Sequence, residues 1–136
     1  LPHSRWYPTK VLLSMPSYIL VVDDVPFIRS VIGLALAEVG YAVRTASNGR
    51  EALTQITEEP PAVVLLDLEM PVMNGWQLLE ELRSRQLAVP VILLTVGPHA
   101  GVEARGYQVA GYLAKPFTLT QLFAVVTPIA DVGQRQ

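Results

Sequence analysis

Residues 18–24 are Tyr-Ile-Leu-Val-Val-Asp-Asp, five consecutive hydrophobic residues followed by two aspartates. An unbroken apolar run without polar alternation is typical of a parallel strand that helices cover on both faces. Residues 62–66 repeat the pattern, and Asp67 follows them directly. Three of the four aspartates in the chain therefore stand at the ends of predicted buried strands.

Strand and helix patterns alternate along the chain on either side of these runs. Predicted strands cover residues 18–22, 41–46, 62–66, 91–94 and 111–113, and predicted helices cover residues 28–39, 49–58, 74–85 and 118–126. Gly40 and Pro60-Pro61 are stop signals for the first two helices, and Asn74 is a candidate N-cap of the third. The alternation predicts an α/β fold, in which helices cover both faces of a parallel sheet.

Helical spacing also predicts which side chains face the core. These are Ile28, Ile32, Ala35 and Val39 in the first helix, Ala52, Leu53 and Ile56 in the second, and Leu78, Leu79 and Leu82 in the third.

Two of the expected helices, one more within residues 96–110 and the last helix, contain residues that disfavour helix. Residues 96–110 should hold one of them, but interior glycine costs about 1 kcal/mol relative to alanine. Gly97, Pro98, Gly101 and Gly106 therefore predict a short or partly melted helix. Pro128 predicts that the last helix ends or kinks there.

The composition restricts the class of protein. A chain of 136 residues, 51% hydrophobic and 16% charged, can bury one substantial core, so we expect one domain. The formal net charge of −2 supplies no basic stripe, which argues against direct nucleic-acid binding. No apolar run approaches the roughly 18 residues of a membrane span, so we expect a cytoplasmic protein without membrane contact. The absence of cysteine excludes disulfides and thiol chemistry.

The first seventeen residues show no sustained hydrophobic periodicity. Residues 1–17 contain three prolines and are predicted to be a tail or a linker, before a domain at residues 18–130 and a C-terminal tail at residues 131–136. Met15 leaves two interpretations open. Translation begins there, or the preceding residues join this domain to a larger protein.

The ends of the predicted strands gather residues that suit charged-ligand chemistry. Asp23, Asp24 and Asp67 are joined there by Thr95 and by Lys115, which is the only lysine outside the N-terminal tail. In sheets of this kind, ligands bind beyond the carboxyl ends of the strands. We therefore expect these five side chains to form one site.

Five motifs, in order, resemble the receiver domain of bacterial two-component response regulators. They are residues 19–24 with Arg29, residues 48–53, residues 66–75, Thr95, and residues 111–117. The resemblance covers residues 18–130. It implies a flavodoxin-like, doubly wound sheet of five parallel strands in the order 2-1-3-4-5.

The resemblance also implies the role of each site residue. Asp67 would be the phosphoacceptor, and Lys115 and the Thr95 hydroxyl would contact phosphoryl oxygens. Asp23, Asp24, Asp67 and the backbone carbonyl of Glu69 would hold Mg²⁺ (or Mn²⁺). The peptide bond between Lys115 and Pro116 would be cis.

The resemblance also implies how such a domain would transmit its signal. Thr95 and Tyr112 would switch the surface of the fourth helix, fifth strand and fifth helix. The implied partners are a sensor histidine kinase or phosphotransfer protein and a downstream output protein or domain, with a homodimer possible. The chain would not be an enzyme that acts on a separate substrate. It would assist its own phosphorylation and its own dephosphorylation, which would be slow.

Two residues depart from the family's pattern. Val96 stands where the family favours a small residue, which predicts slower phosphorylation by small donors and slower hydrolysis. Glu69 adds a carboxylate whose effect on these rates the sequence does not determine.

Other functions compete with this interpretation. The principal alternative is a receiver-like protein interaction module that works without phosphorylation, suggested by Val96 and the weak fourth helix. An FMN-binding flavodoxin would need Gly, Ser and backbone amides where residues 22–29 offer carboxylates. A haloacid-dehalogenase-type phosphatase would place its nucleophile after the first strand and need a longer chain.

Overall fold

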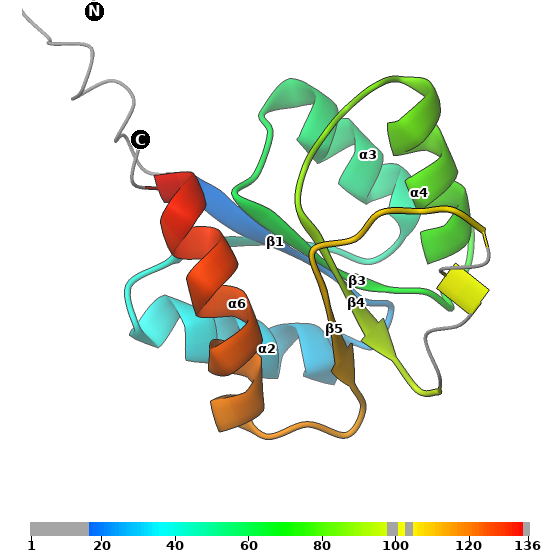
Figure 1. Cartoon of the computed structure of the whole chain (residues 1–136). Coiled ribbons are helices and arrows are strands. Elements are labelled where there is room, and N and C mark those ends of the chain that lie inside the picture. The colour runs from blue at the N-terminus through cyan, green and yellow to red at the C-terminus, as the bar shows by residue number, and fades with distance from the viewer. Residues whose placement is uncertain (1–16, 98–100, 103–104, 135–136) are drawn as a thin grey trace, which may run out of the picture.

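Five parallel strands form one sheet in the part of the chain described by the computed structural model, residues 17–97, 101–102 and 105–134. Their order is β2-β1-β3-β4-β5 (Figure 1). The strands are β1 (Tyr18–Val22), β2 (Ala42–Ala46), β3 (Val63–Asp67), β4 (Val91–Thr95) and β5 (Gly111–Ala114). The predicted fold class and strand order are confirmed.

Helices cover both faces of this sheet, as predicted. Figure 1 shows α2 (Pro26–Glu38) and α6 (Leu119–Gln134) on one face, with α3 (Gly49–Glu58) and α4 (Gly75–Ser84) on the other. Two apolar clusters correspond to these two layers, because successive strand residues point to opposite faces. No helix in the described ranges is both long and apolar enough to cross a membrane.

The burial of each strand follows its place in the sheet. Every residue of β1, β3 and β4 is buried, as expected for central strands with helices above and below. The edge strand β2 is mostly exposed or half-buried. The unbroken apolar runs in the sequence therefore mark the central strands.

The predicted inward faces of α3 and α4 are confirmed, but that of α2 is partly wrong. Ile32 is buried as expected, whereas Val39 lies at the C-cap, beyond the last turn of α2, and is 57% exposed. Leu36 packs into the core instead, one turn after Ile32. The predicted helix ends one residue later than α2 does, so its last inward position, Val39, lies beyond α2.

The last helix does not end at Val126 as predicted, because α6 continues through Pro128 to Gln134, while the kink predicted as the other possible effect of Pro128 stays a prediction. Proline removes one backbone hydrogen bond from a helix. Val126 and Ala130 flank Pro128 and are both fully buried in the cluster beneath α6, so packing on either side offsets the loss. The helix also reaches into the segment that the sequence predicted as a C-terminal tail.

Several predictions fall partly outside the described residues. Residues 1–16, predicted as tail or linker, lie outside them, as do five residues of the predicted helix at 96–110. Within that helix, Gly101 and Val102 are helical, and Val102 is buried in the cluster on the α3 and α4 face.

Candidate functional site

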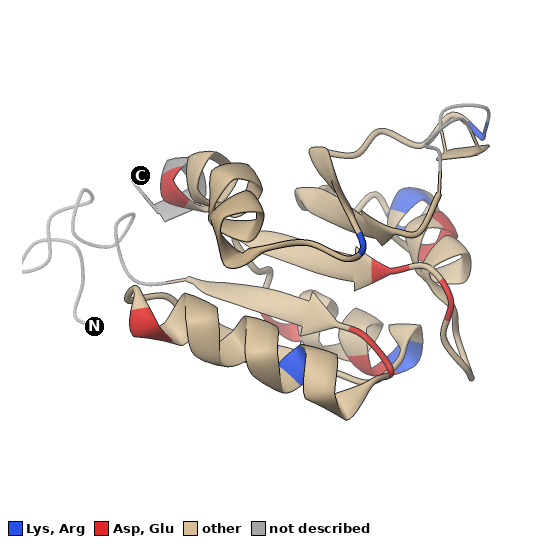
Figure 2. Ribbon diagram, turned by 90° about the horizontal axis from the view of Figure 1, so that it is seen from below, with Lys and Arg blue, Asp and Glu red and all other residues tan. Residues whose placement is uncertain are grey.

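The predicted site residues lie together at the carboxyl edge of the sheet. Asp67 and Thr95 are the last residues of β3 and β4, while Asp23 and Lys115 follow β1 and β5 directly. Parallel strands that lie side by side bring these positions to one edge. Figure 2 shows acidic and basic residues at this edge, beyond the tips of the strands.

Asp23 is completely buried and is held by its neighbours. Its backbone N–H donates to the carbonyl of Ala46 (3.2 Å), at the end of the neighbouring strand β2. One carboxylate oxygen, Oδ1, accepts the Val25 N–H at 2.9 Å, and Oδ2 accepts from Lys115 Nζ at 3.0 Å. Both carboxylate oxygens thus have partners, as a buried carboxylate requires.

The Lys115 ammonium lies between two carboxylates. Its Nζ is 3.0 Å from Asp23 Oδ2 and 3.7 Å from Asp67 Oδ1. The Lys115 backbone N–H donates to the carbonyl of Thr95 (2.7 Å), which ties the start of the following loop to the end of β4. The peptide bond between Lys115 and Pro116 is cis, as the resemblance implies.

Burial raises the pKa of the Asp67 carboxyl above its ordinary value of 3.8. The positive charge of Lys115 and the hydrogen bond from the Glu69 N–H (3.3 Å) oppose that rise in pKa, whereas the nearby charges of Asp23 and Asp24 add to it. Ionised Asp67 therefore carries a desolvation cost that its neighbours only partly offset.

This raised pKa predicts a pH-dependent stability difference between the wild type and Asp67→Asn. The folded chain holds the Asp67 proton more tightly than the unfolded chain, so this carboxyl stabilises the fold below about pH 4. That contribution is lost as the pH rises through the folded-state pKa. Urea unfolding in EDTA from about pH 4 to 7 should show the wild type losing stability relative to Asp67→Asn, and the opposite trend would contradict it.

Three carboxylates form a group that is suited to a divalent cation. Asp23, Asp24 and Asp67 each offer an oxygen, and the three oxygens lie within 4.8 Å of one another. Hard oxygen ligands of this kind, supplemented by water, are those that Mg²⁺ prefers. The residues present therefore fit such an ion.

A pocket of about 210 Å³ opens beside Asp67 and reaches Thr95. Thr95 is 5% exposed, and its Oγ1 has no hydrogen-bond partner among the described residues. A buried hydroxyl without a partner is costly. The pocket can accommodate an acceptor group between Thr95 and Asp67.

Trp76 also lines this pocket, together with Glu69 and Val96. The guanidinium of Arg105 lies 3.9 Å from the centre of the Trp76 ring, and the Tyr107 ring lies beside it at 6.2 Å. Trp76, in the wall of the pocket, therefore contacts the segment that precedes β5 through Arg105 and Tyr107.

The remaining predicted residues lie at the margin of the site. The Glu69 side chain is exposed, and the role of its backbone carbonyl as a ligand of Mg²⁺ stays a prediction. Tyr112 is half-buried against the cluster on the α3 and α4 face, and its switching role stays a prediction.

The loop after Asp67 is held by the start of α4. The N–H of Gly75 donates to the Leu68 carbonyl at 2.9 Å, and Asn74 and Gln77 form a reciprocal capping box, which confirms the predicted N-cap. A Cβ on Gly75 would lie 2.6 Å from the Asp67 carbonyl oxygen and 2.7 Å from the Leu68 Cα. Only glycine allows this close approach.

Gly75→Ala should therefore destabilise the fold by about 3 kcal/mol, because the atoms in its way belong to the backbone. Gly33→Ala is the matched control. A Cβ there meets only Val43 Cγ1 at an ordinary 3.7 Å, and alanine inside a helix should add about 0.5–1 kcal/mol of stability. Urea unfolding of both variants measures the difference, and equal effects would refute this packing argument.

Two features of the site edge escaped prediction. Arg29, quoted above only as part of a motif, donates through a guanidinium nitrogen to the Asp23 carbonyl at 2.7 Å. An apolar groove of about 440 Å³ runs beside Lys115, between the start of α2 and the loop before α6. The available signal in the sequence was that Phe27 and Val31 are apolar although they lie outside the predicted inward face of this helix.

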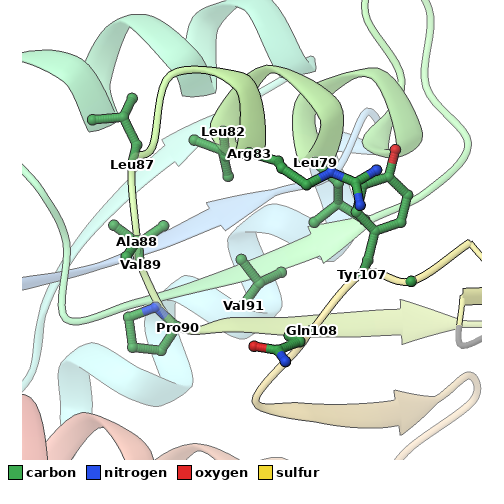
Figure 3. A pocket seen from close by; sticks show the side chains of 11 residues that line it. Leu79, Leu82, Arg83, Leu87, Ala88, Val89, Pro90, Val91, Tyr107 and Gln108 are labelled. Carbon is green, nitrogen blue, oxygen red and sulfur yellow. The ribbon is translucent and has the colours of Figure 1, made fainter.

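A larger hollow, of about 520 Å³, lies away from these residues, where β4 begins (Figure 3). Leu79, Leu82 and Val91 contribute apolar walls, and the Arg83 guanidinium covers the Tyr107 ring at 4.2 Å. None of the predicted site residues lines it.

The geometry described above is that of a receiver domain, and comparison with known proteins agrees. The sequence model of the response regulator receiver domain matches residues 19–127. The chain belongs to this family, which is a class of signalling domains in two-component systems.

Individual relatives show how much of each protein the match covers. Over 110 residues the chain is 39% identical to regulatory protein AtoC of Escherichia coli (strain K12), covering 79% of this chain and 24% of AtoC. Over 112 residues it is 38% identical to response regulator MprA of Mycolicibacterium vanbaalenii, covering 81% of this chain and 48% of MprA. The chain thus spans between about a quarter and a half of these relatives.

A solved structure matches over almost its whole length. The receiver domain of the Francisella response regulator 1452 superposes with a TM-score of 0.77 and 30% sequence identity, covering 85% of this chain and 98% of that one.

Proposed function

We propose that the chain accepts a phosphoryl group on Asp67 from a phosphohistidine of a sensor histidine kinase or phosphotransfer protein. The arrangement around Asp67 is the observation that carries this proposal. A buried carboxylate lies 3.7 Å from the Lys115 ammonium and beside a pocket that contains the Thr95 hydroxyl, which has no hydrogen-bond partner in the described part of the chain.

The transfer requires a nucleophile, a leaving group and compensation of charge. A carboxylate oxygen of Asp67 forms the new O–P bond, and the P–N bond of the phosphohistidine breaks, leaving its electron pair on the imidazole nitrogen. Lys115 lies close enough to Asp67 to contact a phosphoryl oxygen, and the Thr95 hydroxyl can donate to another. Positioning and charge compensation of this kind account for most of the catalysis of phosphoryl transfer.

Asp23, Asp24 and Asp67 would hold Mg²⁺ (or Mn²⁺), with the Glu69 carbonyl as a further ligand. When bound, the ion supplies positive charge that offsets the repulsion between an anionic donor and the Asp67 carboxylate. The Lys115 ammonium can balance only one of the two buried carboxylates, Asp23 and Asp67, and this supports the assignment, because a buried carboxylate without compensating charge is costly.

The apolar groove beside Lys115 is suited to a donor protein. It is lined by Phe27, Val31, Ile32, Val96, Pro116 and Phe117. Phe27, Val31 and Val96 are 73%, 40% and 81% exposed, and a contiguous patch of exposed apolar side chains often marks a protein interaction site. A protein that delivers a phosphohistidine to Asp67 must cover this edge of the sheet, and the groove offers it apolar contact area.

Output would follow from rearrangement around Thr95. A phosphoryl group in the pocket would engage the Thr95 hydroxyl, and Tyr112 would respond at the surface of β5 and the neighbouring helices. The affected surface would then bind an output protein or domain. The two relatives described above extend well beyond the matched region, which supports an output partner or domain.

Intact-mass analysis after incubation with acetyl phosphate and Mg²⁺ tests this function. We expect the mass of one phosphoryl group to be added, and EDTA to suppress the addition. A chain that takes up no phosphoryl group from small donors or from phosphorylated histidine kinases would favour the interaction module that works without phosphorylation.

Val96→Ala should accelerate both phosphorylation by acetyl phosphate and hydrolysis of the acyl phosphate severalfold. Val96 is 81% exposed and lines both the pocket beside Asp67 and the apolar groove, so its side chain lies on the approach to the carboxylate. Val39→Ala, at the exposed C-cap of α2, is the control. Unchanged rates for Val96→Ala would show that access does not limit them.

A further inference from the structure

The turn between β1 and α2 is restrained by two hydrogen bonds to Asp23. The Val25 N–H donates to the carboxylate at 2.9 Å, and a guanidinium nitrogen of Arg29 donates to the backbone carbonyl at 2.7 Å. Val25 is the N-cap of α2 but makes no capping hydrogen bond through its side chain. Arg29 therefore supplies a restraint that the capping residue does not.

Of the three carboxylates in the acidic group, Asp24 is the one held in place by the fewest contacts. Asp23 and Asp67 are buried and contact Lys115, whereas Asp24 is exposed. Among the described residues, no hydrogen bond or ion pair holds its carboxylate. Its direction is therefore set by its own backbone, and the carbonyl that Arg29 binds belongs to the peptide unit joining Asp23 to Asp24.

We propose that Arg29 is a positioning residue, which fixes this peptide unit and thereby directs Asp24 toward the other two carboxylates. The three oxygens, which lie within 4.8 Å of one another, then stay arranged for a divalent cation. Arg29 acts through the Asp23 carbonyl and does not contact the ion. The inference rests on the proposed function, because it takes the acidic group to be a Mg²⁺ site.

Charge alone predicts the opposite effect of losing Arg29. The guanidinium is a positive charge that lies 2.7 Å from the Asp23 carbonyl oxygen, close to the acidic group, so its removal would strengthen the attraction of the carboxylates for Mg²⁺. Loss of positioning would weaken binding, because substitution of groups that orient metal ligands typically lowers affinity by about 10–100-fold. The sign of the change separates the two effects.

Calorimetric Mg²⁺ titrations of the full chain test this inference. We expect Arg29→Met and Arg29→Gln to bind Mg²⁺ about tenfold more weakly than the wild type, and Arg29→Lys to recover part of the affinity. Arg50→Met is the matched control, because it removes an exposed arginine whose side chain makes no hydrogen bond or ion pair with the described residues. Its affinity should stay the same or rise slightly.

Thermal unfolding in EDTA separates positioning from a general effect on the fold. If Arg29→Met and Arg29→Gln bind Mg²⁺ as tightly as the wild type, or more tightly, the inference is overturned. A lower melting temperature with unchanged affinity would assign Arg29 a purely structural role and would also overturn it. If the wild type itself binds no Mg²⁺, the metal site of the proposed function fails as well, whereas normal wild-type binding with unaffected variants rejects this inference alone.

Discussion

Asp67→Asn should abolish phosphoryl uptake from acetyl phosphate and leave a folded chain that is more stable at neutral pH. The amide cannot form the acyl phosphate, because it lacks the carboxylate oxygen that attacks phosphorus. The gain in stability follows from the raised pKa of Asp67, since asparagine removes an ionised group that burial disfavours. Intact mass measures the first effect, and urea unfolding in EDTA at pH 7 measures the second.

Glu69→Gln is the matched control for this substitution. It also replaces one carboxylate by an amide, two residues later, but the Glu69 side chain is exposed and would not carry the phosphoryl group. The control should keep its phosphoryl uptake. A phosphoryl adduct that persists in Asp67→Asn would locate the acceptor elsewhere and refute the assignment.

Lys115→Met should combine a large loss of stability with a large loss of transfer rate. Removing the ammonium leaves the Asp23 carboxylate, which is completely buried, without the partner at 3.0 Å. Breaking a buried pair in this way costs about 3 kcal/mol. Phosphoryl transfer should also slow by about 100-fold or more, the usual effect of removing one group that stabilises developing negative charge. Urea unfolding and the rate of adduct formation measure the two effects.

Arg85→Met is the corresponding control at the surface. Arg85 pairs with Glu81 at the same 3.0 Å distance, but the two side chains are 51% and 38% exposed. Solvent weakens such a pair, so its loss should lower the stability by less than about 0.5 kcal/mol.

Added Mg²⁺ should raise the stability of Lys115→Met by more than it raises that of the wild type. If Lys115→Met and Arg85→Met lost equal amounts of stability, burial of the ion pair would have no special role.

The fold was predictable because burial leaves a clear trace in the sequence of this chain. The central strands β1, β3 and β4 have helices on both faces, and each is therefore an unbroken apolar run. Helix boundaries were predicted well where a local signal exists, as at Asn74. They were predicted poorly at Pro128, where α6 continues because its buried side chains pack on both sides of the proline.

The candidate site was predictable in position but not in its contacts. Parallel strands bring Asp67, Thr95 and Lys115 to one edge whatever the details of packing, so their meeting follows from topology. The pairing of Lys115 with Asp23 joins residues 92 positions apart, and no local pattern encodes it. The contact of Arg29 with the Asp23 carbonyl likewise depends on how α2 lies against β1.

Trp76 gives this chain an intrinsic optical reporter. The sequence contains two tryptophans, and Trp6 lies in the N-terminal segment. Trp76 lines the same pocket as Asp67 and Thr95 and is stacked against Arg105. Indole emission responds to nearby charge and to the packing of its ring. In a Trp6→Phe background, a spectrometer can therefore follow chemistry at the carboxylate in real time, without any attached dye.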